Sequence, residues 1–103
     1  MAKEVDRLQR VLAENLIILR AERGWSLRDV ADRVGAIEGK RVPSPPILYV
    51  ETCRSWPRPR RLRSLAQVYG VPAHTLLDPG YTAFLREHYG GKHDDSNGGA
   101  RAR

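Results

Sequence analysis

The sequence has little cysteine and no long apolar run, and both shortages exclude classes of protein. Cys53 is the single cysteine, so neither an intramolecular disulfide nor a thiolate metal cage can form. No apolar stretch approaches the length of about eighteen residues that a membrane span needs, and the first residues lack the apolar core of a signal peptide. We therefore expect a cytoplasmic protein in a reducing compartment, without membrane contact.

Catalytic signatures are also absent. No nucleophile, base and orienting group recur in a pattern typical of an active-site cleft, and no glycine-rich phosphate loop follows a strand, because no segment reads as a strand. His74, His88 and His93 share no helical face with the cysteine. The sequence predicts no enzyme, no metal site, no cofactor and no small-molecule ligand.

Positive charge is abundant. The chain carries 18 Lys and Arg against 12 Asp and Glu, a formal net charge of +6 in 103 residues. Such an excess concentrates polyanions near a protein surface, and the planar guanidinium of arginine matches phosphate and guanine edges. GC-rich coding is an alternative cause of the arginine content. Nucleic acid is the first partner that the composition predicts.

Apolar residues recur at three- and four-residue steps, which is the period of a helix. Ser26 and Asp29 form a weak capping box at the start of the second helix, while Gly35 and Gly70 read as helix stops. The pattern predicts one all-α domain over residues 1–79 with five helices, at residues 3–23, 26–34, 44–52, 59–69 and 72–77.

Three further segments complete the prediction. A polar loop of about ten residues separates Gly35 from Ser44, which is expected to cap the third helix. A short amphipathic helix is expected over residues 80–89, where Tyr81, Phe84, Leu85 and Tyr89 are apolar. Residues 90–103, rich in Gly, Asp, Ser and Arg, are expected to form a disordered tail.

Several residues in order resemble one family: Leu16, Leu19-Arg20, Arg23-Gly24-Trp25-Ser26, Val30-Ala31, Arg33-Val34-Gly35, Ile47, Val50-Glu51, Leu65-Ala66, Tyr69-Gly70-Val71 and Leu76-Leu77. Over roughly residues 12 to 77 the chain is similar to the Cro/repressor (XRE-like) helix-turn-helix regulators. The resemblance implies a five-helix lambda-repressor-like domain, with the second and third helices as the motif and the third in the DNA major groove. It also implies a transcriptional repressor or activator of bacterial or phage type, associated with the nucleoid and commonly a homodimer, and an internal Arg partner for Glu51.

The chain departs from the family pattern in and around the motif. Its turn between the second and third helices is lengthened, over residues 36–43, and Leu27 stands where many members have a phosphate-binding Gln. The third helix opens with Pro43-Ser44-Pro45-Pro46 in place of base-reading side chains. A non-Gly residue, Cys53, stands where a helix-ending glycine is common, so the third helix is expected to end differently. The predicted base-reading residues are Ser44, Leu48, Tyr49 and Thr52, with Leu48 placed to touch a thymine methyl.

Arginines gather after the third helix, where no carboxylate occurs between Glu51 and Asp78. Their cluster is interpreted as phosphate-binding, and a solvated helix face is the alternative. Lys40 and Arg41 in the lengthened turn are interpreted as a flexible basic arm that also contacts the DNA. The predicted phosphate-binding residues are Arg28, Lys40, Arg41, Arg54, Arg58, Arg60 and Arg61.

Two other functions remain open. The apolar residues of segment 80–89 would suit a protein-interaction module, such as an antitoxin or a polymerase adaptor, although they could equally form a homodimer seam. The arginine cluster, combined with a reading helix poor in polar side chains, would suit a non-specific nucleic-acid-binding protein. Double-stranded DNA and a second copy of the chain are the partners that the leading interpretation predicts.

Overall fold

A computed structural model describes residues 2–90, which form helices joined by turns and contain no strand. The predicted all-α class is confirmed. The predicted tail, residues 90–103, lies outside the described part of the chain except for Gly90, which ends the last helical turn. The elements are α1 (Ala2–Arg23), α2 (Leu27–Glu38), α3 (Ser44–Glu51), α4 (Pro59–Tyr69), the 3₁₀ helix η1 (Ala73–Leu77), α5 (Pro79–Leu85) and the π-helical turn η2 (Arg86–Gly90).

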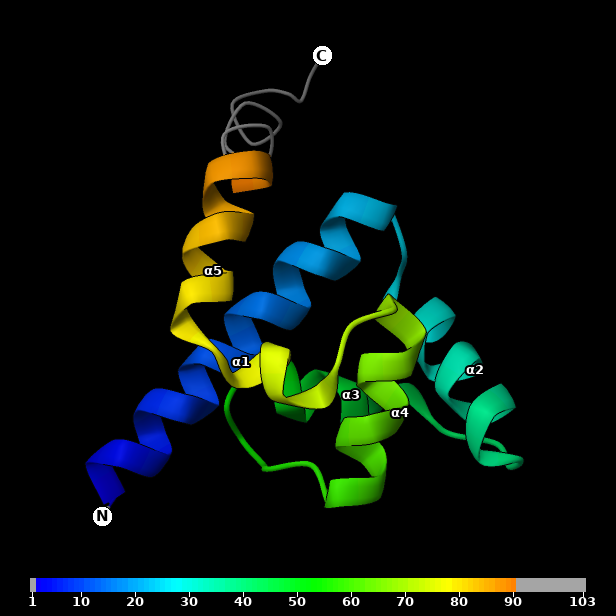
Figure 1. Ribbon diagram of the computed structural model, residues 1–103. Coiled ribbons are helices and arrows are strands. Elements are labelled where there is room, and N and C mark those ends of the chain that lie inside the picture. The colour runs from blue at the N-terminus through cyan, green and yellow to red at the C-terminus, as the bar shows by residue number, and fades with distance from the viewer. Residues whose placement is uncertain (1, 91–103) are drawn as a thin grey trace.

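The long helix α1 forms the centre of the fold (Figure 1). It contacts α3, η1, α5 and η2, while α2 packs on α3 and α4. The helices enclose one cluster of buried hydrophobic residues. Full burial of a large aliphatic side chain stabilises a fold by about 1.5 to 3 kcal/mol, so this cluster dominates stability. Its buried members are Leu12, Leu16, Ile18, Leu19, Val30, Ala31, Val34, Val42, Ile47, Val50, Leu65, Ala66, Tyr69, Leu76 and Leu85.

Helix α2 is longer than predicted. Its capping box is confirmed, because the Asp29 amide donates to Ser26 Oγ and the Ser26 amide donates to the Asp29 carboxylate. The predicted end at Gly35 is wrong: the helix continues to Glu38 and ends at Gly39, whose φ is 74°. A Cβ on Gly35 would lie 2.6 Å from the Lys40 carbonyl oxygen, so this glycine admits a close backbone approach and is not a stop. The loop shrinks to residues 39–43.

Both ends of α3 also differ from the prediction. The N-cap is Pro43, and Ser44 is the first helical residue. A side-chain cap would have little to bind there, because Pro45 and Pro46 remove two of the amide donors that such a cap satisfies. At the other end Cys53 does adopt the left-handed conformation, with φ 62°, and the Arg54 amide donates to the Tyr49 carbonyl at 2.8 Å.

The C-terminal helix is joined to the same core. Helix α5 packs against α1 at an angle (Figure 1), and Leu85 is 1% exposed. The buried amide of Asn15 on α1 donates to the Leu76 carbonyl at 2.9 Å and accepts from the Thr82 hydroxyl at 2.6 Å. The amphipathic helix expected after residue 79 is therefore present. Leu85 is buried in the core, Tyr81 and Tyr89 pack partly buried against it, and Phe84 is exposed.

Candidate functional site

The inner side of α3 is fixed to the rest of the molecule. Ile47 and Val50 are buried, and the carboxylate of Glu51 accepts hydrogen bonds from Arg20 Nε at 2.8 Å and Nη2 at 2.9 Å. A third donor of the same guanidinium reaches the Trp25 carbonyl at 3.1 Å. The Glu51 hydrogen bond raises the pKa of Arg20 above its ordinary value. The internal Arg partner that the family resemblance implies for Glu51 is confirmed.

The outer side of α3 faces solvent. Pro45, Leu48, Tyr49 and Thr52 are exposed and follow the i, i+3, i+4, i+7 spacing of a single helical stripe, which we call the outer stripe. Leu48 is 40% and Tyr49 41% exposed. The Thr52 hydroxyl donates back to the Leu48 carbonyl at 2.8 Å. Of the four predicted base-reading residues, three therefore share this stripe, and the fourth, Ser44, lies half-buried one turn before Leu48.

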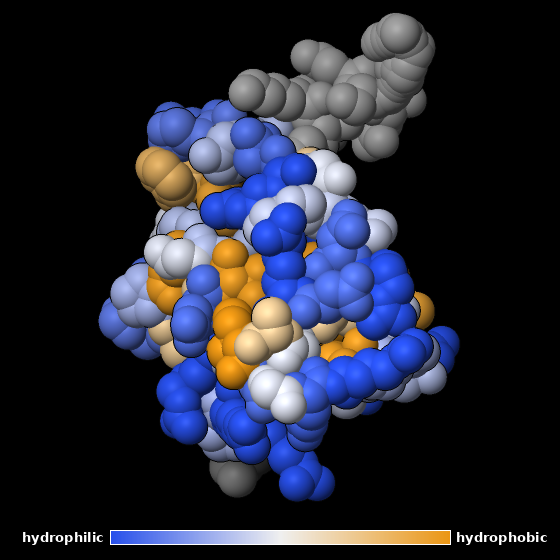
Figure 2. Space-filling view, turned by 90° about the vertical axis from the view of Figure 1, so that its right-hand side faces the viewer, coloured by the Kyte–Doolittle hydropathy of each residue, from blue (hydrophilic) through white to orange (hydrophobic). Residues whose placement is uncertain are grey.

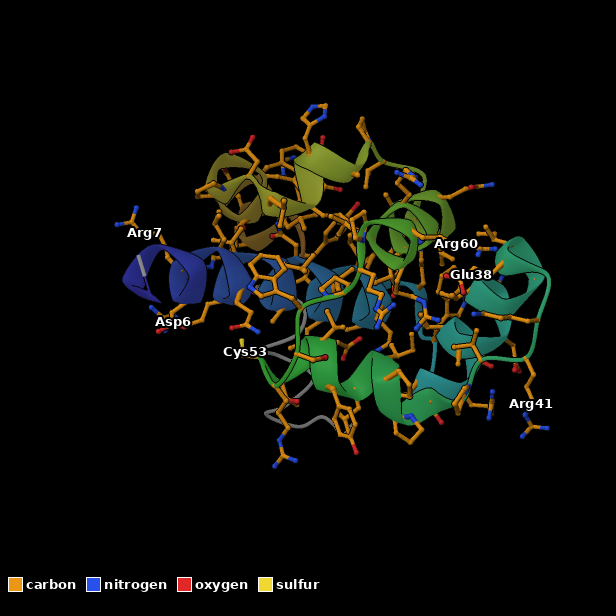
Figure 3. The ribbon with its side chains drawn as sticks, turned by 90° about the horizontal axis from the view of Figure 1, so that it is seen from below. Asp6, Arg7, Glu38, Arg41, Cys53 and Arg60 are labelled. Carbon is orange, nitrogen blue, oxygen red and sulfur yellow. The ribbon has the colours of Figure 1, made fainter. Side chains whose placement is uncertain are left out.

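The loop of residues 39–43 sets where α3 begins. Val42 is 2% exposed, and its carbonyl accepts from Arg28 Nη2 at 2.8 Å. Because Arg28 also pairs with Asp32 at 3.1 Å, its guanidinium already serves the loop and a neighbouring acid. Lys40 and Arg41 remain exposed, and Figure 3 shows Arg41 extending from the outer end of the loop away from the body of the molecule.

The arginine cluster of α4 has an acidic partner that sequence order concealed. Glu38, in the last turn of α2, accepts from Arg61 Nε at 2.8 Å and Nη2 at 3.1 Å. Its side chain is 3% exposed, and the Arg61 hydrogen bond lowers the pKa of this carboxyl. The expectation that no acid opposes the cluster is thus wrong for Arg61. The neighbouring Arg60 donates only to the Glu38 backbone carbonyl, at 3.3 Å, and stays exposed (Figure 3).

A shallow hollow of about 350 Å³ lies between the end of α2, the inner edge of α3 and the start of α4. Lys40, Arg58 and Arg60 line it together with the paired Glu38 and Arg61, and Trp56, which is 38% exposed, forms part of its wall. Helix α4 begins here with Arg58 as an N-cap that makes no side-chain cap hydrogen bond. Cationic side chains beside an uncapped helix N-terminus favour an anion.

Helices α2 and α4 border this region, and Figure 2 views the molecule from their side. Hydrophilic residues cover most of that face, and its apolar atoms form small areas between them. This face therefore offers charged groups more than a broad apolar docking surface.

Residues 11–78 match the family model described as a helix-turn-helix domain. The chain belongs to the helix-turn-helix family. Neither a curated protein nor a solved structure matches it. The matched range includes α2, α3, α4 and η1. The residues between Gly35 and Ser44, which were predicted to form a lengthened turn, are divided between the last residues of α2 and a short loop.

Among the described residues, neither the cysteine nor the potential metal ligands of this helix-turn-helix protein form a second site. Cys53 is half-buried, with Sγ 3.7 Å from the Gln9 carbonyl oxygen. Within residues 2–90, no three His, Cys, Asp or Glu side chains gather as metal ligands would. No helix in this part of the chain is both long and apolar enough to cross a membrane.

Sequence reasoning missed Glu38 as part of the site and left the role of Trp56 open. Glu38 fell inside a segment that was predicted to be a loop, and its partner Arg61 lies 23 residues further along the chain. Local spacing carries no signal for such a pair. Trp56 stood next to Pro57 in a connector, where either packing or stacking was compatible with the sequence.

Proposed function

We propose that the chain is a sequence-specific transcriptional regulator that inserts the outer stripe of α3 into the major groove of double-stranded DNA. The observation that carries this proposal is the division of α3 into two sides. Its inner side is anchored by Ile47, Val50 and the Arg20–Glu51 ion pair, whereas its outer side faces solvent between exposed cations. A rigidly held helix with one free face can keep its register against base edges.

The phosphate contacts are assigned to cations that the chain's own acids leave available. Arg61 is removed from the predicted set because Glu38 neutralises it, and Arg28 is left with a minor role because Asp32 and the Val42 carbonyl engage it. We assign the hollow beside α3 as the binding site of one phosphate of the DNA backbone. The proposed phosphate-binding residues are Lys40, Arg41, Arg54, Arg58 and Arg60.

Selection of bound duplexes from a random pool, followed by competition against unselected DNA, tests this function. We expect the selected duplex to compete far better than bulk DNA. The logarithm of its affinity should fall against the logarithm of salt concentration with a slope of about 4 to 5 for each bound protomer, near 0.9 for each of the proposed contacts. Equal competition by both DNAs would support the non-specific nucleic-acid-binding protein instead, and a flat salt response would refute the phosphate assignment.

A homodimer is part of the proposal, with α5 and η2 as the seam. Phe84 is 47% exposed and stacks between Tyr81, at a ring-centroid distance of 6.0 Å, and His88, at 4.0 Å. Leu85 is unavailable because it is buried in its own core. In sedimentation velocity, Phe84→Ala should shift the protein toward monomer. An unchanged dimer would place the seam elsewhere, and a wild-type monomer would remove the dimer from the proposal.

A further inference from the structure

We infer that α3 distinguishes bases mainly by the C5 methyl group of pyrimidines, above all thymine, and only weakly by hydrogen bonding. This inference rests on the proposed function and names the chemistry that its reading helix recognises. It starts from the composition of the outer stripe, in which Pro45, Leu48 and Tyr49 present a ring, an isobutyl group and an aromatic face.

Hydrogen-bonding groups are scarce along the reading helix. Residues 44–52 contain no Arg, Lys, Asn, Gln or His, the side chains that pair with guanine or adenine edges. Glu51 is the one charged residue among them, and it is buried against Arg20. The hydrogen of the Thr52 hydroxyl is directed at the Leu48 carbonyl, so the free edge of Thr52 is its methyl group and an oxygen acceptor.

The backbone of α3 adds little polar recognition of its own. The first turn of a helix usually offers free amides to an anion or a base edge. Here Pro45 and Pro46 occupy that turn and have no amide hydrogen. Ser44, half-buried at the margin, and the Tyr49 hydroxyl are the remaining polar groups. Bidentate readout of a purine therefore has no side chain to perform it.

The charges that flank the outer stripe indicate which kind of partner binds it. Exposed cations stand at both ends of α3, Arg41 before it and Arg54 after it. Between residues 39 and 77 the single carboxylate is that of Glu51, which is already paired. An apolar strip framed by positive charge is complementary to the major groove, where phosphates line both sides and the thymine methyl is the apolar group on the floor.

One consequence separates this mode of reading from ordinary hydrogen-bond readout. 5-Methylcytosine carries its methyl at the same ring position as thymine, although its hydrogen-bonding edge differs. A reader that depends on the methyl accepts 5-methylcytosine in place of thymine better than it accepts cytosine. A reader of the thymine O4 acceptor rejects both cytosines alike.

The deciding experiment compares two random duplex pools of identical design, one synthesised with thymine and the other with uracil, which lacks only the methyl. We expect the thymine pool to yield the tighter binders. In the duplex selected from the thymine pool, replacing a contacted thymine by uracil should weaken binding by about fourfold, the effect of one buried methyl, and 5-methylcytosine should bind about fourfold better than cytosine there. Equal retention of both pools overturns the inference and leaves DNA binding intact. Retention of neither pool overturns both.

Variants then assign the effect to α3. Leu48→Ala combined with Tyr49→Ala should abolish the difference between thymine and uracil duplexes. Arg54→Ala is the matched control, since it should weaken both duplexes by the same factor and preserve their ratio. A uracil penalty that survives in the double variant would place the methyl contact outside the outer stripe and refute the assignment. Circular dichroism establishes that each variant is folded.

Discussion

The two sides of α3 carry the same kind of residue for opposite purposes. Ile47 and Leu48 are neighbours of similar size, yet Ile47 is 1% and Leu48 40% exposed. On the inner side apolar surface is buried and an acid is neutralised, whereas on the outer side apolar surface is left in water between free cations. Stability alone does not account for the outer side, because solvent exposure of Leu48 and Tyr49 contributes little to folding. The difference shows that a helix can be fixed by one face so that the other remains available for a partner.

Two adjacent arginines of α4 repeat this contrast. Arg61 closes an ion pair with the buried carboxylate of Glu38, while Arg60 stays exposed over the hollow. They are indistinguishable in composition and consecutive in sequence. Because consecutive helical residues point about 100° apart, one arginine joins α4 to α2 and the other faces a prospective anion.

The largest expected effect tests whether the two sides of α3 contribute differently to stability. Ile47→Ala should reduce the free energy of unfolding by about 2 to 5 kcal/mol, because it leaves a cavity in the core. Leu48→Ala, the matched control, should change it by less than about 0.5 kcal/mol. Urea denaturation followed by circular dichroism measures both. Similar losses for the two variants would show that the outer side is part of the core.

A second pair of variants separates the adjacent arginines. Arg61→Ala should cost about 2 to 3 kcal/mol of stability, since it leaves the Glu38 carboxylate buried without its partner. Arg60→Ala should leave stability nearly unchanged and reduce the salt slope of DNA binding by about 0.9 for each bound protomer. The opposite pattern, with Arg61→Ala altering the slope in a fully stable protein, would return Arg61 to the phosphate-binding set.

The pH dependence of stability tests the Glu38–Arg61 ion pair directly. The Glu38 pKa is lowered below its ordinary 4.5 by Arg61, so the pair stabilises the fold above that pH and its contribution is lost as the pH falls through the folded-state pKa. The stability difference between wild type and Glu38→Gln should therefore shrink steadily on acidification. Parallel denaturation series at several pH values give this difference. A gap independent of pH would mean that the carboxyl's charge is not what stabilises the pair.

The smallest expected effect concerns the end of α3. Cys53 has a φ of 62°, a conformation that costs a residue with a Cβ about 1 kcal/mol. Cys53→Gly should therefore be about 1 kcal/mol more stable than Cys53→Ala, since both lose the thiol and only glycine relieves the strain. Thermal unfolding of the two variants compares them. Equal stability would indicate that the backbone relaxes away from the left-handed conformation.

Features set by local sequence could be predicted, and those set by distant partners could not. The Ser26–Asp29 capping box and the stop at Gly70 depend on a few adjacent residues, and both occur as expected. Gly35 misled the prediction because a glycine that admits a neighbouring carbonyl looks, in sequence, like one that ends a helix. That error moved Glu38 into a loop and so hid its pairing with Arg61.

In the candidate site, too, local features could be predicted from the sequence and features that depend on distant partners could not. The 3.6-residue period was sufficient to place Leu48, Tyr49 and Thr52 on one face of a helix. Which cations remain free could not be read from the chain, because it depends on how α2 and α4 meet. The internal acid at Glu51 was anticipated through the family resemblance and not through spacing.

The most direct test of the central claim is to follow backbone amide resonances while the selected duplex is added to the labelled protein. We predict that the largest shifts fall on residues 44–54 and on the loop of residues 39–43, with α5 much less affected. Shifts concentrated on α5 and η2, with α3 unperturbed, would contradict the assignment of α3 as the helix that reads DNA.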